Sequence, residues 1–489
     1  MTTDVGSSKT TAPGGLAVEA NGINVIDESE RKGSPRGLFW PWCAANIAVL
    51  AVSYGAFLLG FGISVWQALL AGVVGTVLSF LLVGLVSLAG KRGSAPTLVL
   101  SRAAFGVRGN ALPALVSYVL LVGWEIILVS LSTLAVTTVF DRLGWAHGTS
   151  VKVVAFVVVA AVIVVAGIKG FDAIIRLQTW LTVVLAAVTV GYVLLTLDHI
   201  HWSTANSLPS GGAKAMLGAS IFAATALGIG WVNAGADYSR YLPRNSSSRG
   251  VVWWTTFGAS VAPVVLIVYG VFLVGSNPKL SQAIGADPIG ALTTLLPTWY
   301  LVPFVVVAVG GLVAGAVLDI YSSGLNLLTL GLPIERWQAA AVDGVLMILG
   351  SIYVLFVSTN FQATFIAFLI TLGVPIAAWC GIFLADLARR TREYDQAALY
   401  DARGRYGQVG WVALLTMIAA TVIGWGLVTN GTKGFTWQGY LLGPLGLGGK
   451  SGDWAYANLG VLAALVVGFV VPFALFNATV RRQEETAAV

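Results

Sequence analysis

Long apolar runs separated by short polar segments make up most of this 489-residue chain. A helix needs roughly 20 mostly apolar residues to cross the hydrocarbon core of a bilayer. A window of that length predicts spanning helices at 38–60, 66–89, 111–136, 151–168, 175–197, 214–235, 253–275, 300–325, 338–357, 361–388, 409–429 and 456–477. Only Ser358, Thr359 and Asn360 separate the ninth from the tenth. The pattern therefore predicts an all-α polytopic membrane protein with about twelve transmembrane helices.

The composition excludes the other classes of protein. Charged residues make up 10% of the chain and hydrophobic residues 57%, with a mean hydropathy of +0.86. A soluble domain carries about 25% charged residues. Cys43 and Cys380 lie inside apolar runs, where a cysteine is typically a small core side chain. Because the chain has three histidines in total, we expect no metal, haem or other cofactor.

The basic residues predict the orientation of the chain in the membrane. Cytoplasmic loops of membrane proteins carry an excess of Lys and Arg. If the N-terminus lies inside, the outer segments hold few of the 27 basic residues, namely Arg142, Lys152, Lys214, Lys279, Lys433 and Lys450. We therefore expect a plasma (inner) membrane protein with a mobile cytoplasmic tail at 1–37, a transporter domain at 38–477 and a cytoplasmic tail at 478–489. The net charge of +6 then reflects this asymmetry and not a nucleic-acid partner.

Two predicted spans contain residues that a regular apolar helix does not need. The first span has Asn46 and Ser53 at mid-depth, and the sixth contains Gly230 and Trp231 within a segment rich in glycine. Spans one and six are five apart, as expected when two inverted five-helix repeats each begin with a broken helix around a central substrate site. Alternatively, the glycines only permit close helix packing. The pattern alone favours neither interpretation.

Three acidic residues fall inside predicted spans. They are Glu125 in the third, Asp319 in the eighth and Asp343 early in the ninth. A charge in hydrocarbon costs about 3 kcal/mol or more, so intramembrane acids usually handle protons or pair with a neighbouring helix. Asp343 lies near a span end and fits the structural interpretation better, whereas Glu125 and Asp319 are candidates for proton coupling.

Two tryptophans also lie near the middle of spans. Most of the others sit at predicted span edges, as is typical of the interfacial aromatic belt. Trp124 and Trp231 instead follow Gly123 and Gly230 at mid-span. Such a pair of indoles could hold a planar heteroaromatic ligand between them, with polar groups contacting its edge.

These segments together resemble the nucleobase:cation symporter-1 family, and specifically its purine–cytosine permease branch. The resemblance rests on Leu38–Asn46, Ser94–Gly109, Gly123-Trp124, Gly230-Trp231, Ala236–Pro243, Asp319–Leu325 and Gly404–Gly407. It implies a leucine-transporter-type fold with a 5+5 inverted repeat and two extra helices. The repeats then fall at about 38–197 and 214–388, and the extra helices at about 409–477.

The resemblance also implies roles for individual residues. Trp124 matches a tryptophan that stacks on the substrate ring, and Trp231 matches the aromatic on the opposite face. Asp319 falls where relatives tend to have a substrate-binding asparagine, and Leu128 where they often have Asn or Gln. The expected substrate site therefore comprises Trp124, Trp231, Gly230, Asn46, Ser53 and Asp319, with Asp319 and Glu125 as the proton-coupling residues.

The eighth span bears on the coupling ion. Sodium relatives keep hydroxyl side chains near the positions of Ala314 and Gly315. The stretch Val305–Leu318 contains neither serine nor threonine, which favours a proton. We therefore predict a symporter that imports a nucleobase-like heterocycle, and not an enzyme, since no nucleophile–base pair or metal constellation appears. A carrier of a ring vitamin or a hydantoin- or allantoin-type compound, with sodium as the other coupling ion, is the alternative.

Overall fold

The computed structural model describes residues 21–169, 171–357 and 361–485. Over these residues the chain is helical and contains no strand. The turn expected at 358–360 lies outside the described residues. The long helices are α1 (Phe39–Asn46), α2 (Leu50–Leu59), α3 (Val65–Gly93), α6 (Ala111–Leu143), α7 (Thr149–Lys169), α8 (Phe171–Thr196), α10 (Ala213–Ala224), α11 (Ser248–Gly275), α14 (Leu301–Thr329), α15 (Arg336–Phe356), α16 (Phe361–Arg389), α17 (Trp411–Gly426) and α18 (Leu459–Glu485).

The described helices account for the predicted spans in order. Ten are long and apolar enough to cross a membrane, and the pair Pro35–Asn46 and Leu50–Leu59 makes an eleventh, bent by 66°. The predicted eleventh span corresponds to α17, which is 16 residues long and shorter than a usual span. Large apolar side chains on the outer faces of these helices, such as Trp180, Val154 and Leu349, are exposed as expected for lipid contact. The predicted all-α membrane fold is confirmed.

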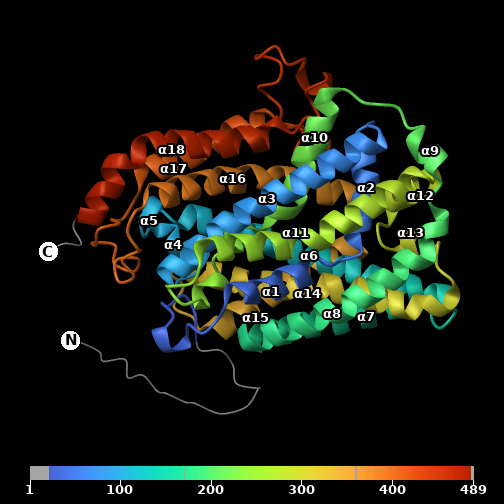
Figure 1. Cartoon of the computed structure of the whole chain (residues 1–489), viewed down its shortest axis with the longest axis horizontal. Helices are drawn as coiled ribbons and strands as arrows, with labels where there is room; N and C mark the ends of the chain where they lie inside the picture. The colour runs from blue at the N-terminus through green and yellow to red at the C-terminus, as the bar shows by residue number, and fades with distance from the viewer. Residues whose placement is uncertain (1–20, 170, 358–360, 486–489) are drawn as a thin grey trace.

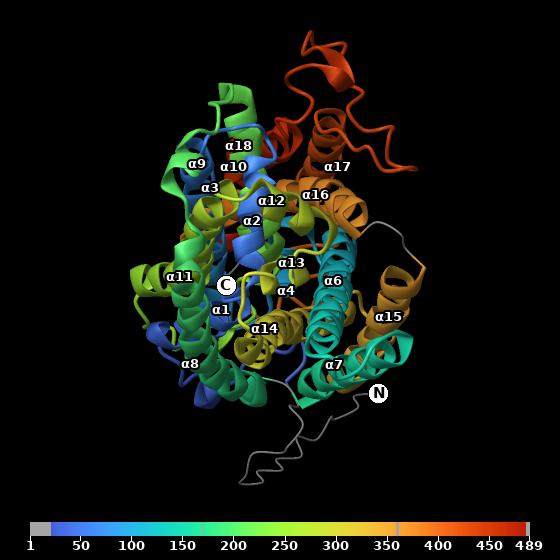
Figure 2. The ribbon, with the colours of Figure 1, turned by 90° about the vertical axis from the view of Figure 1, so that its right-hand side faces the viewer.

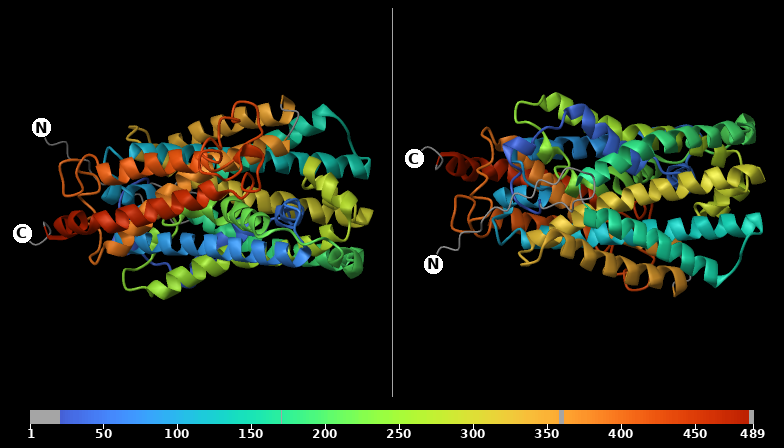
Figure 3. Two further views of the ribbon diagram at one scale, coloured as in Figure 1. Left: turned by 90° about the horizontal axis from the view of Figure 1, so that it is seen from above. Right: turned by 90° about the horizontal axis from the view of Figure 1, so that it is seen from below.

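The helices run roughly along the long axis of the molecule (Figure 3). Helices at equivalent positions of the two expected repeats lie side by side: α3 packs along α11, α6 along α14, and α7 against α15. The last two long helices, α17 and α18, pack on α16 at the side of the bundle opposite α7 and α8 (Figures 1 and 2). The C-terminal pair is therefore an addition to one side of a ten-span bundle.

The described part of the N-terminal segment is held against the helix ends. Ile26 donates its backbone N–H to the Ser94 carbonyl at 2.9 Å, and Arg31 donates to the carbonyls of Lys91 and Leu242, both at 2.7 Å. The side chains of Ile26 and Arg31 are buried. Part of the segment 21–37, expected to belong to a mobile tail, is thus held in place because its polar groups find backbone partners at the end of α3 and at Leu242.

The two described ends of the chain meet at the same end of the bundle. Arg92, which closes α3 near this N-terminal segment, donates to the Arg392 carbonyl, and the neighbouring Thr391 donates its hydroxyl to Glu484 on α18 at 2.8 Å. A hydrogen bond from Arg244 at 2.6 Å lowers the pKa of the Glu28 carboxyl below its usual value. A shared end fits an even number of crossings, and its cytoplasmic location stays a prediction from the basic residues.

Candidate substrate site

The first span breaks where the sequence has Asn46. Helix α1 ends at this residue, Ile47 adopts a non-helical conformation, and α2 begins at Leu50. The Asn46 side chain donates to the Trp42 carbonyl one turn earlier, at 2.8 Å. A short amide that bonds to its own helix competes with the regular backbone pattern. The break presses against α14, where a Cβ on Gly311 would lie 2.7 Å from the Ile47 carbonyl oxygen.

The sixth span is distorted rather than sharply bent. Regular helix ends at Ala224, a π-helical turn covers Thr225–Ile229, and a 3₁₀ turn covers Val232–Ala234. A Cβ on Gly228 would lie 2.3 Å from the backbone of Ser79 on α3. The glycine-rich segment is therefore both irregular and closely packed on α3, and its place at a substrate site stays a prediction.

A small cavity of about 60 Å³ lies between the two irregular segments and is bounded by α6 and α14. Four of the residues predicted for substrate binding line it: Asn46, Trp124, Trp231 and Asp319. Leu128 lines it as well, one turn after Trp124. The tertiary structure thus brings together side chains from four helical segments that are far apart in the sequence.

The two tryptophans are fixed by edge-on contacts with other rings. Trp231 packs on Trp42 with ring centroids 5.6 Å apart, and Trp124 packs on Phe365 at 5.6 Å. Gly230 makes room for the Trp124 indole, because a Cβ at this position would lie 3.1 Å from its Nε1. Gly230 therefore shapes the site through the tryptophan and does not itself line the cavity.

Asp319 is the acidic side chain on the wall of this cavity. It is 1% exposed, and its Oδ2 atom has no hydrogen-bond partner among the described residues. Leaving a buried polar atom without a partner costs free energy, and the cost is larger when the group is charged. A ligand that accepts a hydrogen bond from the protonated carboxyl would remove this cost.

Two predicted site residues lie elsewhere. Ser53 is fully buried and donates to the Pro288 carbonyl at 2.5 Å, which ties α2 to the segment before α13 (Gly290–Thr293). Glu125 follows Trp124 on α6, so its side chain leaves the helix about 100° away from the indole. It faces α14 and α15, not the cavity.

Glu125 and Asp343 share one partner on α14. Ser323 Oγ lies 2.8 Å from Glu125 Oε1 and also contacts Asp343 Oδ2, and all three side chains are buried. The three side chains therefore connect α6, α14 and α15 inside the bundle, as the structural interpretation of a buried acid expects. A part for Glu125 in proton coupling stays a prediction.

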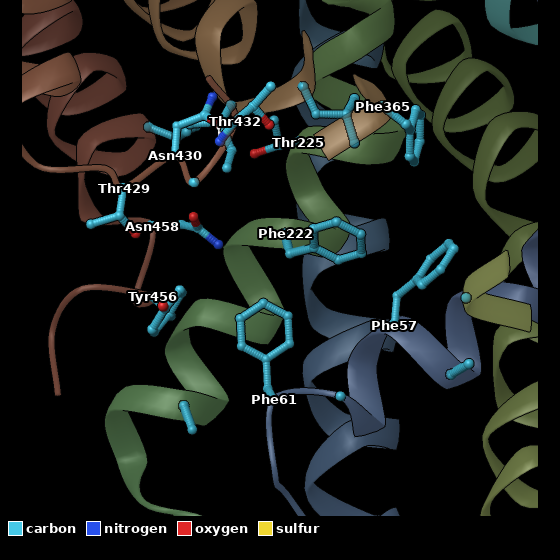
Figure 4. Close-up of a pocket in the computed structure, with 18 of the residues that line it drawn as sticks. Phe57, Phe61, Phe222, Thr225, Phe365, Thr429, Asn430, Thr432, Tyr456 and Asn458 are labelled. Carbon is cyan, nitrogen blue, oxygen red and sulfur yellow. Dashed lines mark hydrogen bonds between the residues drawn. The ribbon is translucent and has the colours of Figure 1, made fainter. Parts of the chain in front are cut away.

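The sequence did not reveal a second, larger cavity of about 890 Å³ beside the first. Its wall includes Phe57 and Phe61 near the end of α2, Phe222 on α10, and Asn430 and Asn458 from the connection between α17 and α18. Figure 4 shows the phenylalanines on one side of this space and the asparagines on the other. We call this space the vestibule. The phenylalanines were visible as apolar residues, but the long α17–α18 connection carried no signal that placed it there.

A bundle in which two interrupted spans meet at a small central cavity is the arrangement found in secondary transporters of the leucine-transporter type. The chain belongs to the family described as "Permease for cytosine/purines, uracil, thiamine, allantoin", which it matches over residues 25–443. The expected membership of the nucleobase:cation symporter-1 family is thereby confirmed. The relatives are permeases, so the protein is a transporter.

Individual relatives support the same assignment. The chain is 22% identical over 471 residues to the putative purine-cytosine permease YxlA of Bacillus subtilis, covering 94% of this chain and 95% of the relative. It is 22% identical over 296 residues to the purine-cytosine permease FCY21 of Saccharomyces cerevisiae, covering 57% and 53%. The solved structure of Mhp1, a nucleobase-cation-symport-1 family transporter in a closed conformation with bromovinylhydantoin bound, has a TM-score of 0.68 at 20% identity and covers 96% of this chain and 100% of that one.

Proposed function

We propose that this permease is a proton-coupled symporter that imports a small nucleobase-like heterocycle, such as a purine, cytosine or a related ring, across the plasma membrane. The observation that carries the proposal is Asp319, a buried acid with an unpartnered oxygen on the wall of the cavity between the two interrupted spans. The substrate class is supported by the family and by the purine-cytosine permeases that the chain resembles.

Trp124 and Trp231 supply the faces of the proposed binding site. Both line the central cavity, and each packs edge-on against another ring. A heterocyclic ring presents flat faces to stack on and a polar edge to hydrogen-bond, so two indoles and one carboxyl match its chemistry. Asn46 adds an amide whose oxygen remains available, since its nitrogen donates to Trp42.

Asp319 couples the proton to the substrate in this proposal. Protonated, its carboxyl donates a hydrogen bond to a ring nitrogen or carbonyl and brings no charge into the cavity. Ionised, it leaves a charge on a largely apolar wall, at a cost of several kcal/mol. Proton and substrate therefore favour each other's binding, which is the thermodynamic requirement for symport.

The contact between the first span and α14 supports a proton over sodium. In this fold, sodium is held by carbonyls of the first span and hydroxyls of the eighth. Here Gly311 and Gly315 face the carbonyls of Ile47 and Ala45, and neither glycine offers an oxygen ligand from a side chain. The Ala314 carbonyl already accepts a hydrogen bond from Gln178 of α8 at 2.8 Å.

A second candidate is a carrier of a ring vitamin or of a hydantoin- or allantoin-type compound, with sodium as the other coupling ion. The observation that favours it is Leu128, an apolar side chain on the cavity wall. Together with Asp319, it leaves the cavity without the two amides expected in carriers of cytosine or purines. A thermal-shift screen with nucleobases, hydantoins and ring vitamins separates the two candidates.

The decisive test compares Asp319→Asn with wild type in proteoliposomes and in binding assays. Asparagine mimics the neutral acid, so the variant should bind and exchange substrate by counterflow but lose both accumulation against a gradient and the pH dependence of binding. Glu125→Gln is the matched control, because Glu125 lies off the cavity. It should keep the pH dependence.

Two results would contradict the proton assignment. One is an Asp319→Asn variant that keeps the wild-type pH slope of binding while Glu125→Gln loses it. The other is a wild-type affinity that rises by about tenfold when sodium is added. Absence of counterflow with every compound in the screen would contradict the transport function itself.

A further inference from the structure

Of the two cavities, the vestibule is the one large enough to hold a whole heterocycle. Its volume is about 890 Å³, against about 60 Å³ for the central cavity. Pockets that hold small molecules usually measure roughly 300–1,000 Å³. The central cavity in this conformation holds only a few water molecules. Lys214 on its wall belongs to a predicted outer segment, so a ring that arrives from that side meets the vestibule before the central cavity.

One side of the vestibule is lined by aromatic faces. Phe222 lies between Phe57 and Phe61, with ring centroids 6.1 and 6.0 Å away, and the three come from two different segments of the chain. Phe57, Phe61 and Phe222 are partly exposed and line the cavity, so part of each ring is accessible from it. Aromatic side chains of this kind stack on heterocyclic bases without requiring a particular base.

The opposite side carries amides from the C-terminal helix pair. Asn430 follows α17 and Asn458 precedes α18 (Figure 4). Asn430 donates to the Ala367 carbonyl at 3.5 Å and accepts the Thr432 backbone N–H at 3.0 Å, so its amide is fixed on both sides. Asn458 donates to the Gly218 carbonyl at 3.3 Å, a long bond, and its amide can turn toward the edge of a bound ring. Helices α17 and α18, which were added to the ten-span bundle, thus contribute to the route that leads through the vestibule to the central cavity.

The charge on the wall matches a neutral ligand. Lys214 and Asp453 are the charged residues that line the described vestibule, and they pair with each other at 2.9 Å. Both are exposed at the mouth of the cavity, where water screens them. The interior is left aromatic and amide-lined, which suits an uncharged planar heterocycle and disfavours a charged one.

Aromatic pairs form the partition between the two cavities. Tyr54 lines the central cavity and packs edge-on against Phe222 of the vestibule, with ring centroids 6.3 Å apart. Trp124 lines the central cavity and packs edge-on against Phe365 of the vestibule at 5.6 Å. A ring stacked on Phe222 therefore lies next to the side chains that separate it from the central cavity.

We propose that the vestibule is a second binding site for the transported ring, of lower affinity than the central one, built from the phenylalanine faces and the α17–α18 amides. The inference rests on the proposed function, because it takes the ligand to be the same neutral heterocycle. In this site the ring waits on the outer side of the Tyr54–Phe222 partition until the central cavity expands.

The test uses a single reactive cysteine in the vestibule wall. Cys43 and Cys380 are 4% and 0% exposed, so neither should react quickly with N-ethylmaleimide. Gln282 on α12 (Pro278–Ala286) is exposed and lines the vestibule, which makes Gln282→Cys the reporter. Cytosine, adenine and uracil serve as the probes. At least one of them should slow alkylation of the reporter in a concentration-dependent way.

The reporter cysteine is then combined with a substitution that removes binding at the central site. Trp231→Ala is the chosen background, because Trp231 packs on Trp42 and not on the vestibule phenylalanines. Protection should persist in Gln282→Cys/Trp231→Ala. Adding Phe222→Ala, or Phe61→Ala if that variant does not fold, should raise the half-protecting concentration about fivefold or more.

Three outcomes overturn the inference: no protection by any of the probes, protection lost together with Trp231, or protection unchanged by both phenylalanine substitutions. The proposed function is tested separately by counterflow of the same probes. Protection that persists in a protein without counterflow would contradict the transport function while leaving the second site in place.

Discussion

The central cavity and the vestibule differ in how the chain builds them. The central cavity takes one or a few side chains from each of four helical segments and encloses a single acid, Asp319. The vestibule is formed largely by helix ends and by the α17–α18 connection, and it reaches solvent at Lys214 and Asp453. Contacts in an enclosed site are strengthened by the low local dielectric, whereas polar contacts near a solvated mouth compete with water. We therefore expect discrimination between substrates in the central cavity and capture in the vestibule.

The largest effect in this comparison is expected from Trp124→Ala. Loss of one stacking face should weaken equilibrium binding by about 1–3 kcal/mol, or roughly 5- to 150-fold, without loss of folded protein. Trp124→Phe keeps a ring and should recover part of the affinity. An alanine variant that binds as tightly as wild type would show that Trp124 is only a packing residue.

Leu128→Gln should have an intermediate effect that changes selectivity. The amide would reach the central cavity from the position now held by Leu128 and provide a hydrogen bond to the edge of a nucleobase, worth about 0.5–1.5 kcal/mol. Competition binding should then shift toward cytosine and purines relative to hydantoins. Leu128→Met, which adds no hydrogen-bonding group, is the control, and an equal shift in both variants would refute the edge-contact explanation.

Phe57→Ala in the vestibule should have a smaller effect than Trp124→Ala. We expect the apparent affinity for uptake to fall by at most about fivefold, with the maximal rate of uptake unchanged, because the capture step is weakened and the central site is intact. The measurement is the concentration dependence of initial uptake. A loss of affinity as large as that of Trp124→Ala would mean that capture and discrimination are not separated between the two cavities.

The smallest effect is expected from Gly315→Ser. A Cβ at this position would lie 3.5 Å from the Ala45 carbonyl oxygen and 3.1 Å from Leu128, so a serine fits after a slight shift. Its hydroxyl adds one of the oxygen ligands that sodium uses in this fold. A sodium-dependent rise in affinity of about twofold is expected in the variant and none in wild type. An equal response in both proteins would contradict the reason given for excluding sodium.

The sequence alone determined the membrane fold, because about 20 apolar residues in a row have few alternatives to a spanning helix. It underestimated helix length at several ends: α6 continues to Leu143, beyond the predicted end at 136, and α11 begins at Ser248, before the predicted start at 253. The hydropathy window follows the apolar core of a helix and misses the polar turns that extend beyond the hydrocarbon.

The site residues show what the sequence around a residue can predict and what it cannot. Asn46, Trp124, Trp231 and Asp319 were recognisable because a polar or aromatic group at mid-span is unusual, whatever it contacts. Ser53 was unusual by the same criterion, yet it bonds to the Pro288 carbonyl away from the cavity. Only packing decides which side of a helix faces the site, since residues one apart point about 100° apart.

The tertiary structure alone decided the vestibule and the meeting of Glu125 and Asp343 at one hydroxyl of α14. Ser323 joins the two acids across three helices, and the α17–α18 connection faces α2 and α10 from more than 160 residues further along the chain. Such contacts depend on how loops and helix ends pack, and the hydropathy of a segment carries no information about its distant neighbours. Periodicity predicts the element, and long-range packing decides what the element surrounds.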